Sequence, residues 1–243
     1  MADHDRRLVD LYDDDNPDGP DHDFYRALAD ESGARSIIDL GCGTGILTVT
    51  FAGPGRRVVG VDPSATMLDH ARQRPGAGSV TWILGDSRQV PVCPDEPADL
   101  AVMTGNVAQH IDDEDWARTL RDLRGALRRG GTLAFESRNP SAEAWGGWTS
   151  SERTTRDTAH GPLEEWSRAD EVSPRVVRLI ASNRFLRTGE TVVETQTLRF
   201  RTRSELERQL DAAGFTVTAV SGDWRRGPVV DSSAVLVVTA SAR

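Results

Sequence analysis

Lysine is missing from this sequence of 243 residues, so all 29 of its basic residues are arginine. The 38 acidic residues outnumber them and leave a formal net charge of −9. A protein that binds DNA or RNA needs a basic surface to neutralise phosphates, and this composition does not supply one. We therefore expect no nucleic-acid partner, and we attribute the absence of lysine to a GC-rich genome rather than to function.

Long hydrophobic runs and cysteine are also scarce. No apolar run approaches the roughly 20 residues needed to cross a bilayer, and the segment Met1-Ala-Asp-His-Asp lacks the basic and apolar blocks of a signal peptide. These absences predict a cytoplasmic protein with no membrane partner. The two cysteines, Cys42 and Cys93, do not form a CxxC pair, which predicts reduced thiols rather than a disulfide framework.

Short apolar segments alternate with helical patterns up to Pro140. We expect strands at 36–40, 57–61, 80–84, 99–103 and 132–136. We expect helices at 21–32, 46–52, 65–74 and 113–128. Ser64 is the expected cap of the third helix, and Gly130-Gly131 is the expected stop of the fourth. Short buried strands that alternate with helices predict a parallel sheet covered on both faces.

After Pro140 the hydrophobicity alternates between neighbouring residues, which predicts antiparallel hairpins. The alternating segments are 176–180, 182–187 and 191–200, with a turn at 188–190. The arginines that recur from Arg175 to Arg203, Arg201 among them, are expected on a solvated sheet face. A last helix is expected at 204–213, with strands at 215–220 and 234–239.

A glycine-rich loop follows the first expected strand and opens the next helix. Glycine stands at every second position, at Gly41, Gly43 and Gly45, which permits a tight turn and a close approach of the backbone to a ligand. The dinucleotide fingerprint instead places its third glycine three residues after the second. Asp39 comes just before the turn, where a carboxylate suits an ammonium group better than a pyrophosphate. We therefore expect a ligand with an amino acid end.

Two further acids follow the next two strands. Asp62 comes after the second strand, where an acid can accept both hydroxyls of a ribose. Asp86 follows the third strand and can accept from an adenine amino group. Because open α/β sheets bind ligands at the carboxyl ends of their strands, these acids and Asp39 are expected to face one crevice. For each acid alone, a role in a turn or a helix cap stays open.

These motifs resemble those of the class I S-adenosylmethionine-dependent methyltransferases, over residues 21–140 and again over 203–240. The resemblance implies an α/β fold, with a Rossmann-like doubly wound sheet of parallel strands and an antiparallel last strand. An antiparallel β insertion would follow the fifth strand. The implied divisions are an N-terminal lid at 1–20, a cofactor-binding domain at 21–140 and 201–243, and a substrate-covering insertion at 141–200.

By the same resemblance, the cofactor is S-adenosylmethionine and its product is S-adenosylhomocysteine. The residues implied in cofactor binding are Tyr12, Asp39, Gly41, Cys42, Gly43, Gly45, Asp62, Pro63, Met67, Asp86, Ser87, Gly105 and Asn106. The glycine loop would hold the amino acid part and Asp62 the ribose. Pro63 and Met67 would flank the adenine, and Gly105 with Asn106 would line the methionine side. Tyr12 belongs to the lid.

The acceptor implied by the resemblance is an N or O atom of a small-molecule metabolite or natural product. Methyltransferases that act on nucleic-acid amines resemble one another in an Asn/Asp-Pro-Pro-aromatic sequence after the fourth strand, whereas this chain has Thr104-Gly-Asn-Val. Acids are also missing at the positions where metal-dependent members hold their ion, so we predict no catalytic metal. His110 is the best candidate for a general base, with capping or loop ordering as the alternative.

The candidate substrate contacts are Glu136, Arg138, Trp145 and Trp148. The two charged residues leave the fifth strand toward the active face, where an ion pair with the lid is the alternative role. The tryptophans could form an aromatic wall over the acceptor. Alternatively, they form the core of a small antiparallel layer or a homodimer face on the insertion.

Two competing functions stay open. The chain could be a catalytically silent S-adenosylmethionine-binding module that acts as a partner-binding subunit, since an intact loop does not demonstrate turnover. A nicotinamide or nucleotide-sugar enzyme is disfavoured by the G-x-G-x-G spacing of the loop.

Overall fold

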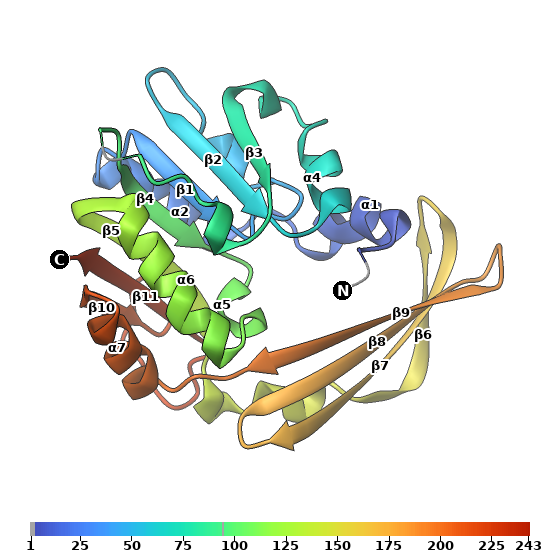
Figure 1. Cartoon of the computed structure of the whole chain (residues 1–243). Coiled ribbons are helices and arrows are strands. Elements are labelled where there is room, and N and C mark those ends of the chain that lie inside the picture. Colours follow the sequence, from blue (N-terminus) through green and yellow to red (C-terminus); the bar gives the residue numbers. More distant parts are fainter. Residues whose placement is uncertain (1–2, 94) are drawn as a thin grey trace.

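The computed structural model describes residues 3–93 and 95–243, which form two sheets and their covering helices (Figure 1). The larger sheet has seven strands in the order β10-β11-β5-β4-β1-β2-β3. Their bounds are β1 Ser36–Leu40, β2 Arg57–Asp62, β3 Val80–Leu84, β4 Ala98–Met103, β5 Leu127–Arg138, β10 Phe215–Ser221 and β11 Val235–Ala242. Residues 1–2 of the predicted lid and residue 94 of the predicted cofactor domain lie outside the described residues.

Parallel pairing joins β1 to β2 and β4, β2 to β3, and β4 to β5. β11 runs antiparallel to both of its neighbours, β5 and β10. The predicted doubly wound sheet with an antiparallel last strand is therefore confirmed. Since β1 to β5 are parallel, their carboxyl ends share one edge of the sheet.

Helices pack on both faces of this sheet. Their bounds are α1 Arg6–Asp15, α2 Pro20–Glu31, α3 Thr48–Phe51, α4 Ala65–Ala71, α5 Val107–His110, α6 Asp113–Ala126 and α7 Arg203–Ala212. On one face, α2 and α3 pack with Ile37 and Val58. On the other face, α6 and α7 pack with Ile38 and Val59. Neighbouring strand residues thus point to opposite faces, and both faces are buried.

The second sheet has four antiparallel strands in the order β6-β7-β8-β9. Their bounds are β6 Ser150–Thr158, β7 Gly161–Ser173, β8 Val176–Phe185 and β9 Glu190–Arg199. This sheet follows the carboxyl end of β5, extends along the edge where the parallel strands end, and brings its far end beside α1 (Figure 1). The predicted antiparallel insertion is confirmed. β6 and β7 were not predicted, and β8 runs unbroken through the expected break at 181.

The predicted stop at Gly130-Gly131 is wrong. This glycine pair lies inside β5 rather than after a helix. Ala98 pairs with Leu127 and Leu100 pairs with Thr132, so the residues between these two positions of β5 form a bulge. Glycine suits a bulge because the backbone there leaves the regular extended conformation.

Two helices near the glycine loop are shorter than predicted. α3 covers only Thr48–Phe51 instead of 46–52, where Thr48, Val49 and Thr50 are β-branched and therefore poor helix formers. α4 ends at Ala71 instead of 74. The predicted cap of α4 is confirmed, because the Ser64 side chain accepts from the Met67 N–H.

Candidate functional site

The glycine loop is packed against the protein at one glycine and open at another. At Gly41 (φ +77°), a Cβ atom would lie 2.4 Å from Cγ2 of Val107, so a larger residue does not fit. At Gly43 (φ +53°), no atom of the described residues lies within 4 Å of a Cβ position. The backbone at Gly43 can therefore meet a ligand.

Asp39 lies at the end of β1 below this loop and is 1% exposed. Its Oδ2 accepts from Thr48 Oγ1 at 2.7 Å. Within the described part of the chain, its Oδ1 has no hydrogen-bond partner. Burial raises the pKa of Asp39 to about 7, although the Thr48 hydrogen bond acts in the opposite direction. A buried carboxylate oxygen without a donor is costly, and an ammonium group would supply donors.

Asp62 ends β2 and is 7% exposed. Its Oδ2 accepts from the Gly43 N–H at 2.8 Å, and its Oδ1 accepts from the Ser64 N–H at 2.9 Å. Burial raises the pKa of Asp62, while the two N–H donors lower it. Asp62 thus ties the glycine loop to the start of α4. Each carboxylate oxygen keeps a further lone pair for a ligand hydroxyl.

Asp86 and Ser87 are engaged by their own surroundings. The Asp86 carboxylate caps a short helix at 87–89 and pairs with the guanidinium of Arg88, which lowers its pKa. Ser87 is buried, and its hydroxyl donates to Asp122 Oδ2 at 2.6 Å. Contact of either residue with an adenine stays a prediction, and the Ser87 hydroxyl already has an acceptor.

The other predicted adenine and loop residues lie close to the glycine loop. The Cys42 N–H donates to the Val61 carbonyl at 3.2 Å, and the Gly45 N–H donates to the Cys42 carbonyl at 2.9 Å. The Cys42 thiol is buried, so this residue offers its backbone rather than its side chain. Pro63 is exposed, and Met67 is buried in α4.

Gly105 and Asn106 form a left-handed turn after β4, with φ angles of 66° and 61°. A buried carboxylate fixes this turn. The Asn106 N–H donates to one oxygen of Glu136, and the Tyr25 hydroxyl donates to the other. Burial raises the pKa of Glu136 to about 7, against these two hydrogen bonds. Both oxygens are therefore engaged, and contact of Glu136 with an acceptor stays a prediction.

Three predicted residues, His110, Tyr12 and Arg138, influence one another electrostatically. Desolvation by neighbouring atoms, and then the charge of Arg138, lower the pKa of His110 to about 4, although the residue as a whole is exposed. Burial raises the pKa of Tyr12, although the charge of Arg138 acts in the opposite direction. These residues come from α5, from the end of β5 and from α1. His110 is therefore neutral near pH 7 and a weak base, and its catalytic role stays a prediction.

Trp145 and Trp148 pack on Phe200, with ring centroids 4.4 and 5.8 Å from the Phe200 ring. Together with Val177 they form a small hydrophobic cluster of the insertion. Trp148 also lies 5.0 Å from the guanidinium carbon of Arg138. Contact of the tryptophans with an acceptor stays a prediction, as does a homodimer through this sheet.

The predicted position of Arg201 on a solvated face is wrong, because this residue is 5% exposed. Its guanidinium donates to the carbonyls of Ala108 at 2.7 Å and Ile111 at 2.8 Å and pairs with Asp113 at 2.8 Å. Arg201 thus holds α5 against the start of α6. The sequence pattern missed it because its acceptors are mostly backbone carbonyls from a distant segment.

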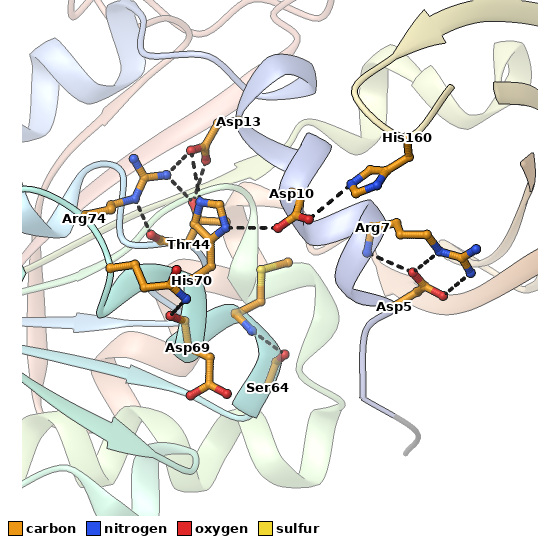
Figure 2. Close-up of polar contacts among 12 residues, drawn as sticks. Asp5, Arg7, Asp10, Asp13, Thr44, Ser64, Asp69, His70, Arg74 and His160 are labelled. Carbon is orange, nitrogen blue, oxygen red and sulfur yellow. Dashed lines mark hydrogen bonds and ion pairs between the residues drawn. The ribbon is translucent and has the colours of Figure 1, made fainter. Parts of the chain in front are cut away.

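The predicted lid contains an anchored helix, α1, which lies between the two sheets (Figure 1). Leu11 packs with Leu163 and Phe185 of the four-stranded sheet. On the other side, Asp13 accepts from Thr44 Oγ1 of the glycine loop at 2.6 Å and pairs with Arg74 (Figure 2). No motif predicted these partners, although the run of acidic residues around Asp13 is of a kind that pairs with basic or hydroxyl groups.

Asp10 of the same helix lies between two histidines from different parts of the fold (Figure 2). Its carboxylate is 3.1 Å from Nε2 of His160, at the turn between β6 and β7, and 3.7 Å from Nδ1 of His70 on α4. No sequence pattern indicated these contacts. α1 therefore connects the insertion to the sheet that carries the glycine loop.

Within residues 3–93 and 95–243, no group of three His, Cys, Asp or Glu side chains is arranged to bind a metal ion. The metal-free mechanism stays a prediction. Within the same range, no helix has the length and apolar character of a membrane span.

Comparison with known proteins identifies the segment that carries the loop. Residues 37–131 match the family described as a methyltransferase domain. Among curated proteins, the cypemycin N-terminal methyltransferase of a Streptomyces species is 26% identical over 209 residues, which are 84% of this chain and 82% of that protein. This similarity therefore extends beyond the family match into the insertion.

Solved structures repeat the whole arrangement. The CcbJ methyltransferase from Streptomyces caelestis superposes with a TM-score of 0.77 at 21% identity, over 99% of this chain and 100% of that one. CalS10 from Micromonospora echinaspora is an amino pentose methyltransferase with bound S-adenosylmethionine. It superposes with a TM-score of 0.69 at 18% identity, over 100% of both chains. At these identities the likeness concerns the fold.

Proposed function

We propose that this chain, whose residues 37–131 match a methyltransferase domain, is an S-adenosylmethionine-dependent methyltransferase that methylates a nitrogen atom of a small acceptor of the natural-product type. The names of two similar proteins support this choice, since one is an N-terminal methyltransferase and another acts on an amino pentose. The cofactor supplies a methyl group that its sulfonium has already activated. The protein's part is to hold the acceptor in line and to exclude water.

The groups around the glycine loop fit this cofactor. Asp39 Oδ1, which lacks a donor among the described residues, suits the ammonium group of the methionine part. The open backbone at Gly43 leaves room beside it. Asp62 would accept from the ribose hydroxyls, and the turn at Asn106 would line the methionine side. These assignments follow from donor and acceptor chemistry and are part of the proposal.

The observation that favours nitrogen is that the two candidate bases, His110 and Glu136, are poorly suited to take a proton from the acceptor. A phenol, with a pKa of about 10, needs a base to become a good nucleophile, whereas a neutral amine does not. The pKa of His110 is lowered to about 4. Both oxygens of Glu136 are engaged by Tyr25 and Asn106. The site is thus better suited to an amine that arrives neutral than to a hydroxyl.

The direct test uses S-adenosylmethionine with a deuterated methyl group and a library of paired small molecules that carry either an amine or a hydroxyl at the same position. Product mass and fragmentation locate the label. We expect labelled amines and unlabelled hydroxyl partners. Labelling of the hydroxyl partners alone would contradict nitrogen transfer, and a wild-type protein that binds neither S-adenosylmethionine nor S-adenosylhomocysteine by calorimetry would contradict the function itself.

His110→Asn tests the weak-base argument with the amine acceptor that the screen identifies. If the acceptor nitrogen is neutral when it reacts, kcat should fall by less than about threefold, whereas loss of a general base costs about 10²–10⁴. The pH profile of kcat/KM should rise with the acceptor's own deprotonation in both proteins. A loss of two orders of magnitude, together with a changed pH profile, would assign His110 as the base.

A further inference from the structure

Arg138, the last residue of β5, is a half-buried cation with few protein partners. Its Nη1 donates to Oε1 of Gln109 at 3.1 Å, and its Cζ lies 5.0 Å from the ring centroid of Trp148. No carboxylate in residues 3–93 or 95–243 lies within 4.0 Å of its nitrogen atoms. Burial lowers the pKa of Arg138, although the charge of Glu136 opposes this effect. A cation in such a place is costly unless a counter-charge arrives.

Arg201 shows how the same fold treats a buried arginine with a structural role. The two Nη groups of Arg201 donate to two backbone carbonyls and to the carboxylate of Asp113, and its Nε is sealed from solvent without a partner among the described residues. A guanidinium has five N–H donors in one plane. Arg138 uses one of its Nη groups on Gln109, and its Nε and Nη2 are not sealed from solvent. Arg138 therefore keeps an open donor edge where Arg201 does not.

The groups near this open edge come from several elements. Trp148 belongs to the segment that leads from β5 into the four-stranded sheet, and its ring is close enough to hold the guanidinium plane. The charge of Arg138 acts on Tyr12 and His110, which belong to two other elements. The guanidinium thus contacts α5 through Gln109 and the start of the insertion through Trp148, and its charge also acts on Tyr12 of α1.

We propose that Arg138 binds a carboxylate of the methyl acceptor and so selects amines that also carry an acid group. This inference rests on the proposed function, because it concerns the acceptor of the same transfer. The planar fork offers two parallel N–H donors, which match the two oxygens of a carboxylate. A single bound carboxylate would fix the acceptor at one end and leave its nitrogen to be directed toward the methyl group.

The surrounding charge favours a carboxylate over a phosphate. A phosphate monoester carries about −1.5 to −2 charges at pH 7, whereas a carboxylate carries one. Arg138 is a single cation, Glu136 is close enough to influence it, and the chain has no lysine and a net charge of −9. One guanidinium therefore balances a carboxylate but leaves a phosphate partly uncompensated.

The test measures anion binding to the full chain loaded with S-adenosylhomocysteine. The probes are acetate, benzoate and hippurate, each compared with its neutral primary amide by calorimetry and by saturation-transfer NMR. We expect at least one carboxylate to bind about tenfold more tightly than its amide. Arg138→Gln should abolish this preference, and Arg138→Lys should retain part of it, because lysine keeps the charge but loses the fork. Arg168→Gln is the matched control, since the Arg168 side chain is 70% exposed on β7.

Three results would overturn the inference. Wild-type protein that binds each carboxylate no better than its amide has no such site. A preference that survives in Arg138→Gln places the site elsewhere. If Arg138→Gln instead loses S-adenosylhomocysteine, Arg138 holds the carboxylate of the cofactor rather than that of the acceptor. Wild-type protein that fails to bind S-adenosylhomocysteine contradicts the proposed function, whereas the other results leave that function intact.

Discussion

Among single residues, Asp39 shows how a proposed ligand site opposes stability. Its pKa rises from an ordinary value of 3.8 to about 7 in the folded protein, so the folded state binds the proton more tightly than the unfolded state. The free energy of unfolding therefore decreases as the pH rises from about 4 to about 7 and then stays level. Glu136, whose pKa is also raised to about 7, acts in the same direction.

Replacing Asp39 by asparagine should separate stability from binding. At pH 8, Asp39→Asn should raise the free energy of unfolding by about 1–3 kcal/mol, because the buried charge is gone. Near pH 4 this gain should shrink to less than about 1 kcal/mol, since Asp39 is then neutral in the folded state and only partly ionised in the unfolded state. Urea titrations at pH 4 to 8 measure this difference, and calorimetry should show weaker S-adenosylhomocysteine binding in the variant.

Asp157→Asn is the control, because Asp157 is exposed on β6. It should not change the pH dependence. If Asp39→Asn raises the free energy of unfolding by the same amount at pH 4 and pH 8, burial of the charge is not the cause of the stabilisation.

The spacing of the acids along the chain was enough to place Asp39 and Asp62 at the ends of two strands, because strand ends are easy to locate in an α/β pattern. Their partners were harder to find. The Tyr25 hydroxyl donates to Glu136 across 111 positions of sequence, and no motif relates these two residues. Asp86 was placed correctly after β3, but its ion pair with Arg88 depends on a local turn that the motif does not describe.

Among the elements, α1 has the most contacts that no sequence pattern indicated. Its N-cap is Asp5, whose side chain accepts from the Arg7 N–H, and Leu11 is buried against the insertion. Asp13 holds Thr44 of the glycine loop and Arg74. The sequence predicted only an N-terminal lid at 1–20 and indicated none of these partners.

Asp13→Ala should loosen α1 from the glycine loop. Since Tyr12 is its neighbour, we expect S-adenosylhomocysteine to bind about fivefold to tenfold more weakly. The free energy of unfolding should change by less than about 1 kcal/mol, because partly exposed ion pairs contribute little. Calorimetry and urea titration measure the two quantities.

Asp14→Ala is the matched control, because Asp14 is exposed on the same helix. If both variants bind the product equally, the Asp13 contacts do not support the site. A stability loss of several kcal/mol in Asp13→Ala would instead make α1 part of the folding core.

The strands of the larger sheet were predictable because burial on both faces makes them continuously apolar. β6 and β7 were not, since their segments 150–158 and 161–173 are rich in charged residues and carry few apolar side chains. β7 pairs with β8, which contributes Val177 and Phe185 to two small hydrophobic clusters, and β6 in turn pairs with β7. A pattern search therefore recovers a strand whose own side chains are buried and misses one that depends on its neighbour.

For the whole molecule, the relation between the two sheets depends on α1. Asp10 contacts His160 at the far turn of the insertion and His70 on α4 (Figure 2). Leu11 and Asp13 add contacts to the same two parts. No sequence pattern relates these segments, because they are far apart in the chain and polar. If α1 couples the glycine loop to the insertion, a ligand bound at the loop should also reduce local opening at the β6–β7 turn.

Hydrogen exchange tests this coupling directly. In the wild type, S-adenosylhomocysteine should slow exchange both in the glycine loop and at residues 158–161. Asp10→Ala removes the link to His160, so slowing should persist in the loop but largely disappear at the turn, since local opening there no longer depends on α1. Asp14→Ala should behave like the wild type. Protection of the turn that survives in Asp10→Ala would mean that the insertion closes on the site without help from α1.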